Sequence, residues 1–154
     1  MLQNEGYKTA AAGKWQINDF RVIPDAMAQA GFDEYMMWTG FEEGNSPSAN
    51  RYFEPYIHTG GPNGTPSSRT YNDAFGPDLF ADFLVDFIRD NKNEPWFAYY
   101  PMVLPHGPTT ATPADPSASG LINQTRAMVE YTDILLKRLL DTCLLYTSPS
   151  PRDS

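Results

Sequence analysis

The sequence has a single cysteine and no long hydrophobic run. Cys143 alone can form neither an internal disulfide nor a cysteine metal cluster. No stretch approaches the ~20 apolar residues that a membrane-spanning helix needs. The first residues, MLQNEGYK, also lack the charged and then apolar layout of a signal peptide. The sequence therefore predicts no disulfide scaffold, no cysteine-based metal site and no membrane span.

Positive charge is also scarce. The chain has 11 Lys and Arg residues against 19 Asp and Glu residues, so its formal net charge is −8. Binding to nucleic acid or to an anionic membrane needs a basic surface that faces the phosphates, and this composition argues against both partners. An anionic ligand would therefore have to be held by a few well-placed cations.

What remains is the composition of one modest globular domain, with 154 residues, 41% hydrophobic and 14% aromatic. Helices that alternate with strands indicate an α/β fold. In chain order, periodicity and turn residues predict the end of a helix at 1–6, a strand at 7–12, a short helix at 24–30, a strand at 32–38, a helix at 77–91, a strand at 96–104 and a helix at 121–142. Because the chain starts on the end of a helix, we expect that native sequence precedes it.

Two segments carry more specific predictions. WFAYYPMVL, at 96–104, is almost continuously apolar, which predicts a strand buried on both faces, as in a parallel sheet. The segment from Thr39 to Tyr71 is rich in Gly, Pro, Ser and Asn, and we expect a long irregular insertion there. The aromatic residues within this insertion favour an ordered conformation over a disordered one.

Lys14 and His106 are candidates for an anion-binding pair. Each follows a predicted strand, and in open α/β sheets ligands bind beyond the C-terminal ends of the strands. If the two strands are parallel neighbours, an ammonium group and an imidazole meet at one edge of the sheet, a pairing that suits phosphate or sulfate. The alternative is that Lys14 is an ordinary surface lysine and His106 only stabilises its proline-rich turn.

The motifs in their order resemble the middle of a sulfatase of the alkaline phosphatase superfamily. The family pattern has a Gly-Tyr-x-Thr-x-x-x-Gly-Lys-Trp segment and, later, a strand that ends in Pro-His-x-Pro. This sequence has GYKTAAAGKW, then FDEY and the PDLFADFLVDFI helix, then PWFAYYPMVLPHGP. The resemblance covers roughly Leu2 to Asp141. It implies a mixed, largely parallel sheet flanked by helices, of which this chain holds an internal part.

The resemblance also implies a chemistry. Sulfatases hydrolyse sulfate monoesters with a formylglycine nucleophile made from Cys or Ser and with a divalent cation, usually calcium. The lysine of the Gly-Lys-Trp motif contacts the sulfate, and the histidine of the Pro-His-x-Pro loop donates to the sulfate or to the leaving-group oxygen. These roles correspond to Lys14 and His106 as catalytic and substrate-binding residues. Fixed cationic donors are what the charge on a transferring sulfuryl group requires.

Three features depart from the family pattern or lie outside it. The usual motif continues with histidine, where this chain has Gln16; glutamine donates a hydrogen bond but takes up no proton near neutral pH. Gln16 therefore either positions the substrate, slows turnover, or only braces its loop.

The nucleophile motif Cys/Ser-x-Pro-x-Arg is absent from the sequence. The acids that bind the metal come from segments that the resemblance does not cover, so we assign no metal ligands and expect calcium and formylglycine to lie outside this fragment.

The resemblance adds an interpretation for two further segments. Aromatic residues and Arg51, within 45–56, are expected on a rim loop near the active site, where rings and a guanidinium suit a sulfated sugar; the alternative is that the rings only pack the loop.

The residues 143–154 change abruptly in composition and resemble translated sequencing-adapter sequence. We interpret them as a non-native tail after a catalytic-domain fragment at 1–142.

The sequence thus predicts a fragment of a sulfuric ester hydrolase that acts on a small-molecule or oligosaccharide sulfate ester, and that is inactive without its missing segments. Two alternatives stay open: a phosphodiesterase or phosphomonoesterase of the same superfamily, and a non-catalytic relative that binds sulfated glycans. The resemblance implies a periplasmic or secreted enzyme, and no nucleic-acid partner is expected.

Overall fold

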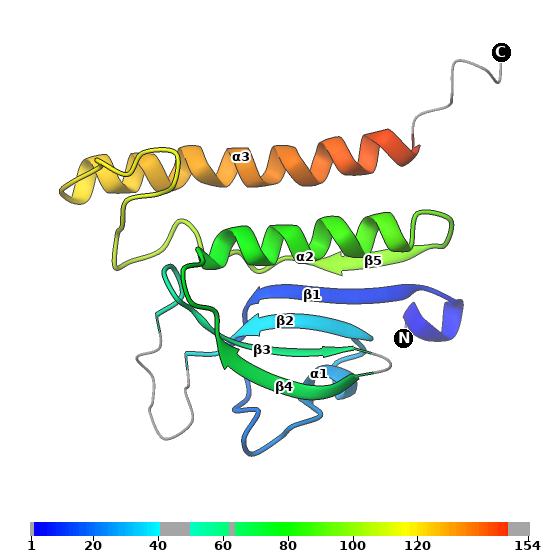
Figure 1. The fold of residues 1–154 in the computed structure, drawn as a ribbon. Coiled ribbons are helices and arrows are strands. Elements are labelled where there is room, and N and C mark those ends of the chain that lie inside the picture. Colours follow the sequence, from blue (N-terminus) through cyan, green and yellow to red (C-terminus); the bar gives the residue numbers. More distant parts are fainter. Residues whose placement is uncertain (1, 41–49, 62–63, 148–154) are drawn as a thin grey trace, which may run out of the picture.

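The structure, a computed structural model, describes residues 2–40, 50–61 and 64–147. A five-stranded sheet in the order β4-β3-β2-β1-β5 forms its centre (Figure 1). The strands are β1 (Lys8–Lys14), β2 (Glu34–Trp38), β3 (Tyr56–Gly61), β4 (Gly64–Thr70) and β5 (Trp96–Tyr99). The helices are a 3-10 turn η1 (Leu2–Glu5), α1 (Ala26–Gln29), α2 (Gly76–Asp90) and α3 (Leu121–Thr147).

Strand β1 lies between two parallel neighbours, β2 and β5, whereas β3 and β4 continue the sheet as an antiparallel hairpin. The α/β fold with a mixed sheet is therefore confirmed. The parallel strands all point the same way, so their C-terminal ends lie at one edge of the molecule, beside the start of α2 (Figure 1).

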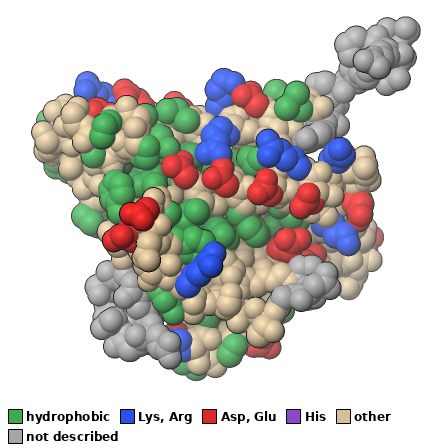
Figure 2. All heavy atoms as spheres, viewed as in Figure 1, with side chains coloured by type: hydrophobic (Ala, Val, Ile, Leu, Met, Phe, Trp, Pro, Cys, Tyr) green, Lys and Arg blue, Asp and Glu red, His purple; other side chains and the backbone are tan. Residues whose placement is uncertain are grey.

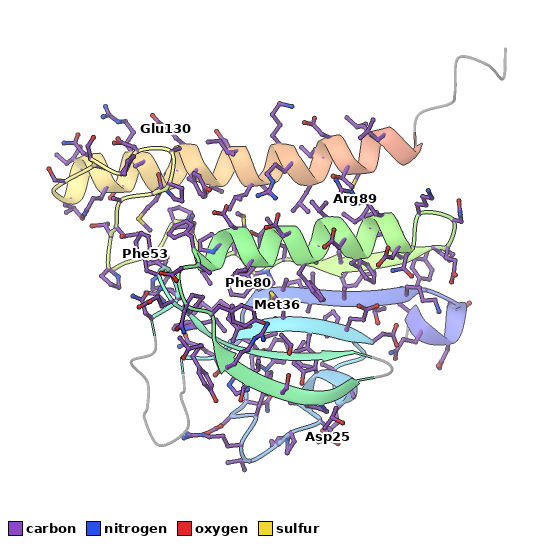
Figure 3. All side chains as sticks on the ribbon, in the orientation of Figure 1. Asp25, Met36, Phe53, Phe80, Arg89 and Glu130 are labelled. Carbon is purple, nitrogen blue, oxygen red and sulfur yellow. The ribbon has the colours of Figure 1, made fainter. Side chains whose placement is uncertain are left out.

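The α2 face of the sheet holds the larger core. Small side chains at Ala10 and Ala12 of β1 are fully buried and let α2 approach the sheet, where it packs Phe80, Leu84 and other apolar residues (Figure 3). The periodicity of the α2 sequence predicted this apolar face. Helix α3 forms an outer layer on α2 and contributes Met128, Tyr131 and Leu135 to the same cluster.

The opposite face of the sheet carries a second, smaller cluster of buried residues. It is built around Ala11, Trp15, Tyr35 and Met37, and α1 and the segment before it cover part of this face. Because neighbouring residues of a strand point to opposite faces, Ala11 packs here while Ala10 and Ala12 pack under α2. The two clusters hold the middle of β1 on both sides.

The predicted irregular insertion at Thr39–Tyr71 is wrong in its second half. Strands β3 and β4 lie there, paired from Tyr56↔Thr70 to Gly61↔Gly64. Strand β4 contains Pro66 and two serines, but it lies at one edge of the sheet, where a residue without an N–H is tolerated. Residues 41–49 lie outside the described residues.

Two other predictions differ from the structure. The strand expected at 96–104 ends at Tyr99, because β5 is an edge strand and Pro101 follows; Phe97 and Tyr99 are 40% and 44% exposed, so this strand is not buried on both faces. Helix α3 continues past the predicted end at 142 to Thr147, and Cys143 packs against the larger core. No helix in the described part of the chain is long and apolar enough to cross a membrane.

Candidate active site

A cavity of about 630 Å³ lies at the C-terminal ends of the parallel strands. Lys14 is the last residue of β1 and pairs in register with Trp38, the last residue of β2, while His106 follows β5. The structure therefore brings Lys14, Gln16 and His106 to the same cavity. The lining residues are Lys14, Gln16, Trp38, Asn50, Arg51, Tyr52, Phe53, His106, Pro108, Thr109 and Thr110.

The end of β1 is held directly against the segment that leads to His106. The Lys14 amide donates to the Pro101 carbonyl at 2.7 Å. Gly13 makes this approach possible, because a Cβ atom at this position would lie 2.2 Å from the same carbonyl oxygen, and its φ of +124° suits only glycine. The Gly13-Lys14 pair thus places the lysine next to the segment that leads to the histidine.

The His106 ring is oriented by its own loop. Its Nδ1 lies 2.6 Å from the Gly107 carbonyl oxygen. A carbonyl can only accept, so Nδ1 carries a proton and Nε2 is the ring atom left for a ligand. In the doubly protonated ring, Nε2–H can donate to an anion. His106 is exposed, so a ligand in the cavity can reach it.

Arg51 and Tyr52 connect the other wall of the cavity to the His106 loop. The Tyr52 hydroxyl donates to the His106 carbonyl, and an Arg51 Nη2–H donates to the Gly107 carbonyl. The guanidinium lies over the Trp38 ring, 5.0 Å from its centroid. Burial raises the pKa of the Tyr52 hydroxyl above its ordinary value, although Arg51 opposes this effect, so the hydroxyl stays protonated and remains a donor.

The cavity is cationic, although the chain is acidic. None of the lining residues among those that the structure describes is an Asp or Glu. Lys14 and Arg51 form no salt bridge with any described residue, in contrast to most cations of the chain. Those paired with a carboxylate are Lys8, Arg21, Arg89, Arg126, Lys137 and Arg138. Two cations without a carboxylate in one concave site are what an anionic ligand requires.

Gln16 lies at the exposed side of the cavity. Its amide packs against Gly40, whose φ is +81° and where a Cβ atom would lie 2.8 Å from Gln16 Nε2. The side chain therefore has room because residue 40 is glycine. An amide at this position can donate to a ligand oxygen, and its role in turnover stays a prediction.

The rim-loop prediction for 45–56 separates into two parts. Arg51, Tyr52 and Phe53 line the cavity with Lys14, whereas Tyr56 lines a different cavity of about 360 Å³ that also contains His58. Phe53 is 45% exposed, next to the N-terminal end of α2 (Figure 3). The residues 45–49 are not among those described.

Sequence reasoning missed Trp38 and the threonines of the cavity. Trp38 was assigned to a strand, and only the register of β1 and β2 shows that it ends beside Lys14. Thr109 and Thr110 follow the Pro-His-x-Pro pattern closely, and this closeness was the one signal that could have included them.

The described residues do not fit a metal site. They contain no group of three or more His, Cys, Asp or Glu side chains that could hold a metal ion. Calcium needs six to eight oxygen ligands, most of them carboxylates or carbonyls.

Comparison with known proteins gives one family and one fold. The family model described as Sulfatase matches residues 1–144. The crystal structure of Ps i-CgsB is similar, with a TM-score of 0.68 and 21% sequence identity over 94% of this chain and 35% of that chain. The structure of Ps i-CgsB in complex with k-i-k-neocarrahexaose gives a TM-score of 0.67 and 22% identity, over 94% and 36%. The chain therefore spans about a third of these solved proteins.

Proposed function

We propose that this chain, which belongs to the sulfatase family, forms the central part of a catalytic domain that hydrolyses O-sulfate esters of carbohydrates. The observation that supports this proposal most is the cavity itself. Lys14, His106 and Arg51 meet there without a carboxylate among the described lining residues, in a chain of net charge −8. Such a site favours a compact anion.

Lys14 and His106 would hold the sulfate group from different sides. The Lys14 ammonium, at the end of β1, donates to the non-bridging oxygens and stabilises the negative charge that they carry in the transition state. His106 Nδ1 already donates to the Gly107 carbonyl, so only the doubly protonated ring can donate to the substrate, through Nε2–H. Both groups are attached to fixed backbone, which reduces the reorganisation needed during the reaction.

His106 could serve a second purpose at the leaving group. A sugar hydroxyl is a poor leaving group as the alkoxide, so transfer of a proton to the ester oxygen as the S–O bond breaks would help the reaction. The imidazolium form of His106 carries this proton on Nε2. The ring would then return to its neutral form with Nδ1 still donating to Gly107.

A carbohydrate is the substrate class that fits the rest of the cavity. The exposed Phe53 ring and the residues Thr109 and Thr110 line the cavity, whereas Trp38 and Tyr52, which also line it, are each only 4% exposed. Aromatic faces and hydroxyl groups are suited to a sugar ring. The similar fold of Ps i-CgsB has been captured with an oligosaccharide, k-i-k-neocarrahexaose, which supports the same class for this chain.

The remaining parts of the site would come from segments outside these residues. By resemblance to the family, those parts are a formylglycine nucleophile and a calcium ion. The nucleophile motif is absent from this sequence and no metal cluster occurs among the described residues. We therefore expect no turnover from the 154 residues alone.

The test compares sulfate and phosphate esters in the full-length enzyme. We expect release of inorganic sulfate from a sulfated oligosaccharide, measured by ion chromatography, and much slower release of phosphate from the matched phosphate ester. Faster phosphate release would favour the phosphatase alternative. Binding of the sulfated oligosaccharide without release of either anion would favour the non-catalytic alternative, for which Gln16 in place of the family histidine is the supporting observation.

A further inference from the structure

We propose that Tyr52 and Arg51 are positioning residues, which hold the loop that carries His106 at the right place on the cavity wall. The proposal rests on the proposed function only for its kinetic readout. It assigns a role to a segment that the sequence indicated as an irregular insertion, and the contacts of that segment with the histidine loop carry it.

Tyr52 is the more direct of the two contacts. The residue is 4% exposed, and its ring stacks on Phe75 with centroids 6.4 Å apart. Its hydroxyl donates to the His106 carbonyl and lies 3.4 Å from the Val103 carbonyl oxygen. One buried hydroxyl thus contacts backbone acceptors on both sides of the turn that presents the histidine.

Arg51 adds a second contact at the next peptide of the loop. Its Nη2–H donates to the Gly107 carbonyl. The Gly107 carbonyl is also the acceptor for His106 Nδ1, so Arg51 and the imidazole share one oxygen. The planar guanidinium lies 5.0 Å from the centroid of the Trp38 ring and 5.2 Å from that of the Tyr52 ring, and both contacts restrain it. Any shift of Arg51 would therefore move an acceptor that sets the orientation of the ring.

The segment that supplies both residues is anchored to the N-terminal end of α2. The Gly76 amide donates to the Tyr52 carbonyl at 2.6 Å, and the Glu54 amide donates to the Ala74 carbonyl at 2.9 Å. A Cβ atom on Gly76 would lie 2.2 Å from the Arg51 carbonyl oxygen, so glycine permits this close contact. The His106 loop is thus braced, through two side chains, by the start of a helix that packs on the sheet.

Precise placement of the imidazole has a kinetic consequence. A donor that is displaced by about 1 Å from the developing charge can lower the rate by on the order of 100-fold. A bracing role predicts that substrate binding, which also depends on Lys14, changes less than the chemical step. The signature is therefore a loss in kcat that exceeds the change in KM.

The main experiment replaces Tyr52 by phenylalanine. Tyr52→Phe keeps the ring and its stacking on Phe75 but removes the donor hydroxyl. Tyr56→Phe is the matched control, because that hydroxyl lies 2.8 Å from Ser68 Oγ and its ring packs edge-on to His58. In the full-length enzyme, we expect Tyr52→Phe to lower kcat by roughly 10- to 100-fold with a smaller change in KM. Tyr56→Phe should keep the wild-type kcat.

A second readout needs no turnover. It is made on the 154-residue chain, which has two histidines, so their ring signals in NMR spectra report on the two places separately. Tyr52→Phe should shift or broaden the His106 ring signals and leave those of His58 unchanged, whereas Tyr56→Phe should do the reverse. If Tyr52→Phe does not fold, as judged by circular dichroism, Arg51→Gln is measured in the same way and is expected to move the His106 signals.

The outcomes separate this inference from the proposed function. Unchanged His106 signals in the folded variant overturn the positioning role, whether or not the enzyme hydrolyses sulfate esters. A wild-type kcat for Tyr52→Phe in an active enzyme overturns it as well. A wild-type enzyme that releases no sulfate contradicts the proposed function alone, and shifted His106 signals would then still support the bracing of the loop.

Discussion

Lys14 differs from most other cations of this chain in its surroundings. It is half-buried at the end of β1, with no salt bridge to a described residue, on a cavity whose described lining has no carboxylate. Lys8, at the other end of the same strand, lies 3.7 Å from Glu94 on the surface. One strand thus presents two lysines, of which Lys8 has a carboxylate partner and Lys14 has none among the described residues.

This difference allows a matched test at the scale of single residues. Lys14→Ala in the full-length enzyme should lower kcat/KM for a sulfate ester by at least ~100-fold, because a donor to the developing charge is lost. Lys8→Ala changes the net charge by the same amount and should leave kcat/KM within about twofold, since exposed ion pairs contribute little. Equal losses in the two variants would mean that charge, and not position, explains the effect.

At the scale of elements, the junction between β1 and the segment after β5 sets the geometry of the cavity. The Lys14 amide donates to Pro101, and Gly13 faces the same carbonyl without a side chain. The two strands therefore position the lysine and the histidine through one shared peptide contact. A change at Gly13 should act on stability and on the site together.

Gly13→Ala tests that junction. The added Cβ would lie 2.2 Å from the Pro101 oxygen at a φ of +124°, so we expect a loss of more than about 1 kcal/mol in the free energy of unfolding, measured by urea denaturation. Gly61→Ala is the control, because its Cβ would meet only Glu34 Cγ at 4.0 Å. Similar stabilities of the two variants would contradict the close approach at Gly13.

The contact between α2 and α3 makes a second prediction at this scale. Acidic side chains of α2 lie alongside basic side chains of α3 on one face of the molecule (Figure 2), and Arg138 pairs with Asp78 and Asp82. The Tyr131 hydroxyl donates to Asp78 Oδ1 at 2.7 Å. Burial raises the pKa of Asp78 above 3.8, although the Tyr131 and Arg138 contacts oppose this effect.

The sign of the resulting pH dependence follows from linkage. An acid with a raised pKa binds its proton more tightly in the folded state than in the unfolded state. Its contribution to the free energy of unfolding is therefore greatest below pH 3.8 and is lost as the pH rises through the raised pKa. Asp78→Asn keeps an acceptor for Tyr131 but does not titrate. The stability of wild type relative to Asp78→Asn should therefore fall as the pH rises through this window, measured by denaturant unfolding at each pH. A relative stability that rises with pH would show that the ion pair with Arg138 dominates.

At the scale of the whole molecule, local patterns predicted the elements that have strong local signals. The apolar face of α2 was visible at a helical period, and the structure places the helix at Gly76–Asp90. The meeting of Lys14 and His106 was predicted on the condition that their strands are parallel neighbours, because ligands bind beyond the C-terminal ends of such strands, and β1 and β5 are parallel neighbours. The family resemblance supplied their proposed roles, which geometry alone does not.

The elements that were missed depend on pairing between distant residues. The sequence of β4 predicts a loop because it contains a proline and serines. The segment forms a strand because it pairs with β3 at the edge of the sheet. The apolar composition of β5 predicts a strand buried on both faces. In the structure β5 is partly exposed, and no strand of the described residues other than β1 pairs with it. The bracing of His106 by Arg51 and Tyr52 joins residues more than 50 positions apart, and no local pattern encodes such a contact.

NMR of the two histidine rings in the 154-residue chain tests whether Lys14 and His106 bind one sulfate group. Inorganic sulfate is titrated into the chain, with chloride at matched ionic strength as the control. We expect saturable shifts of the His106 ring signals, unchanged His58 signals, and loss of the His106 shifts in Lys14→Ala. Sulfate that leaves His106 unaffected, or that shifts it equally in Lys14→Ala, would contradict the claim.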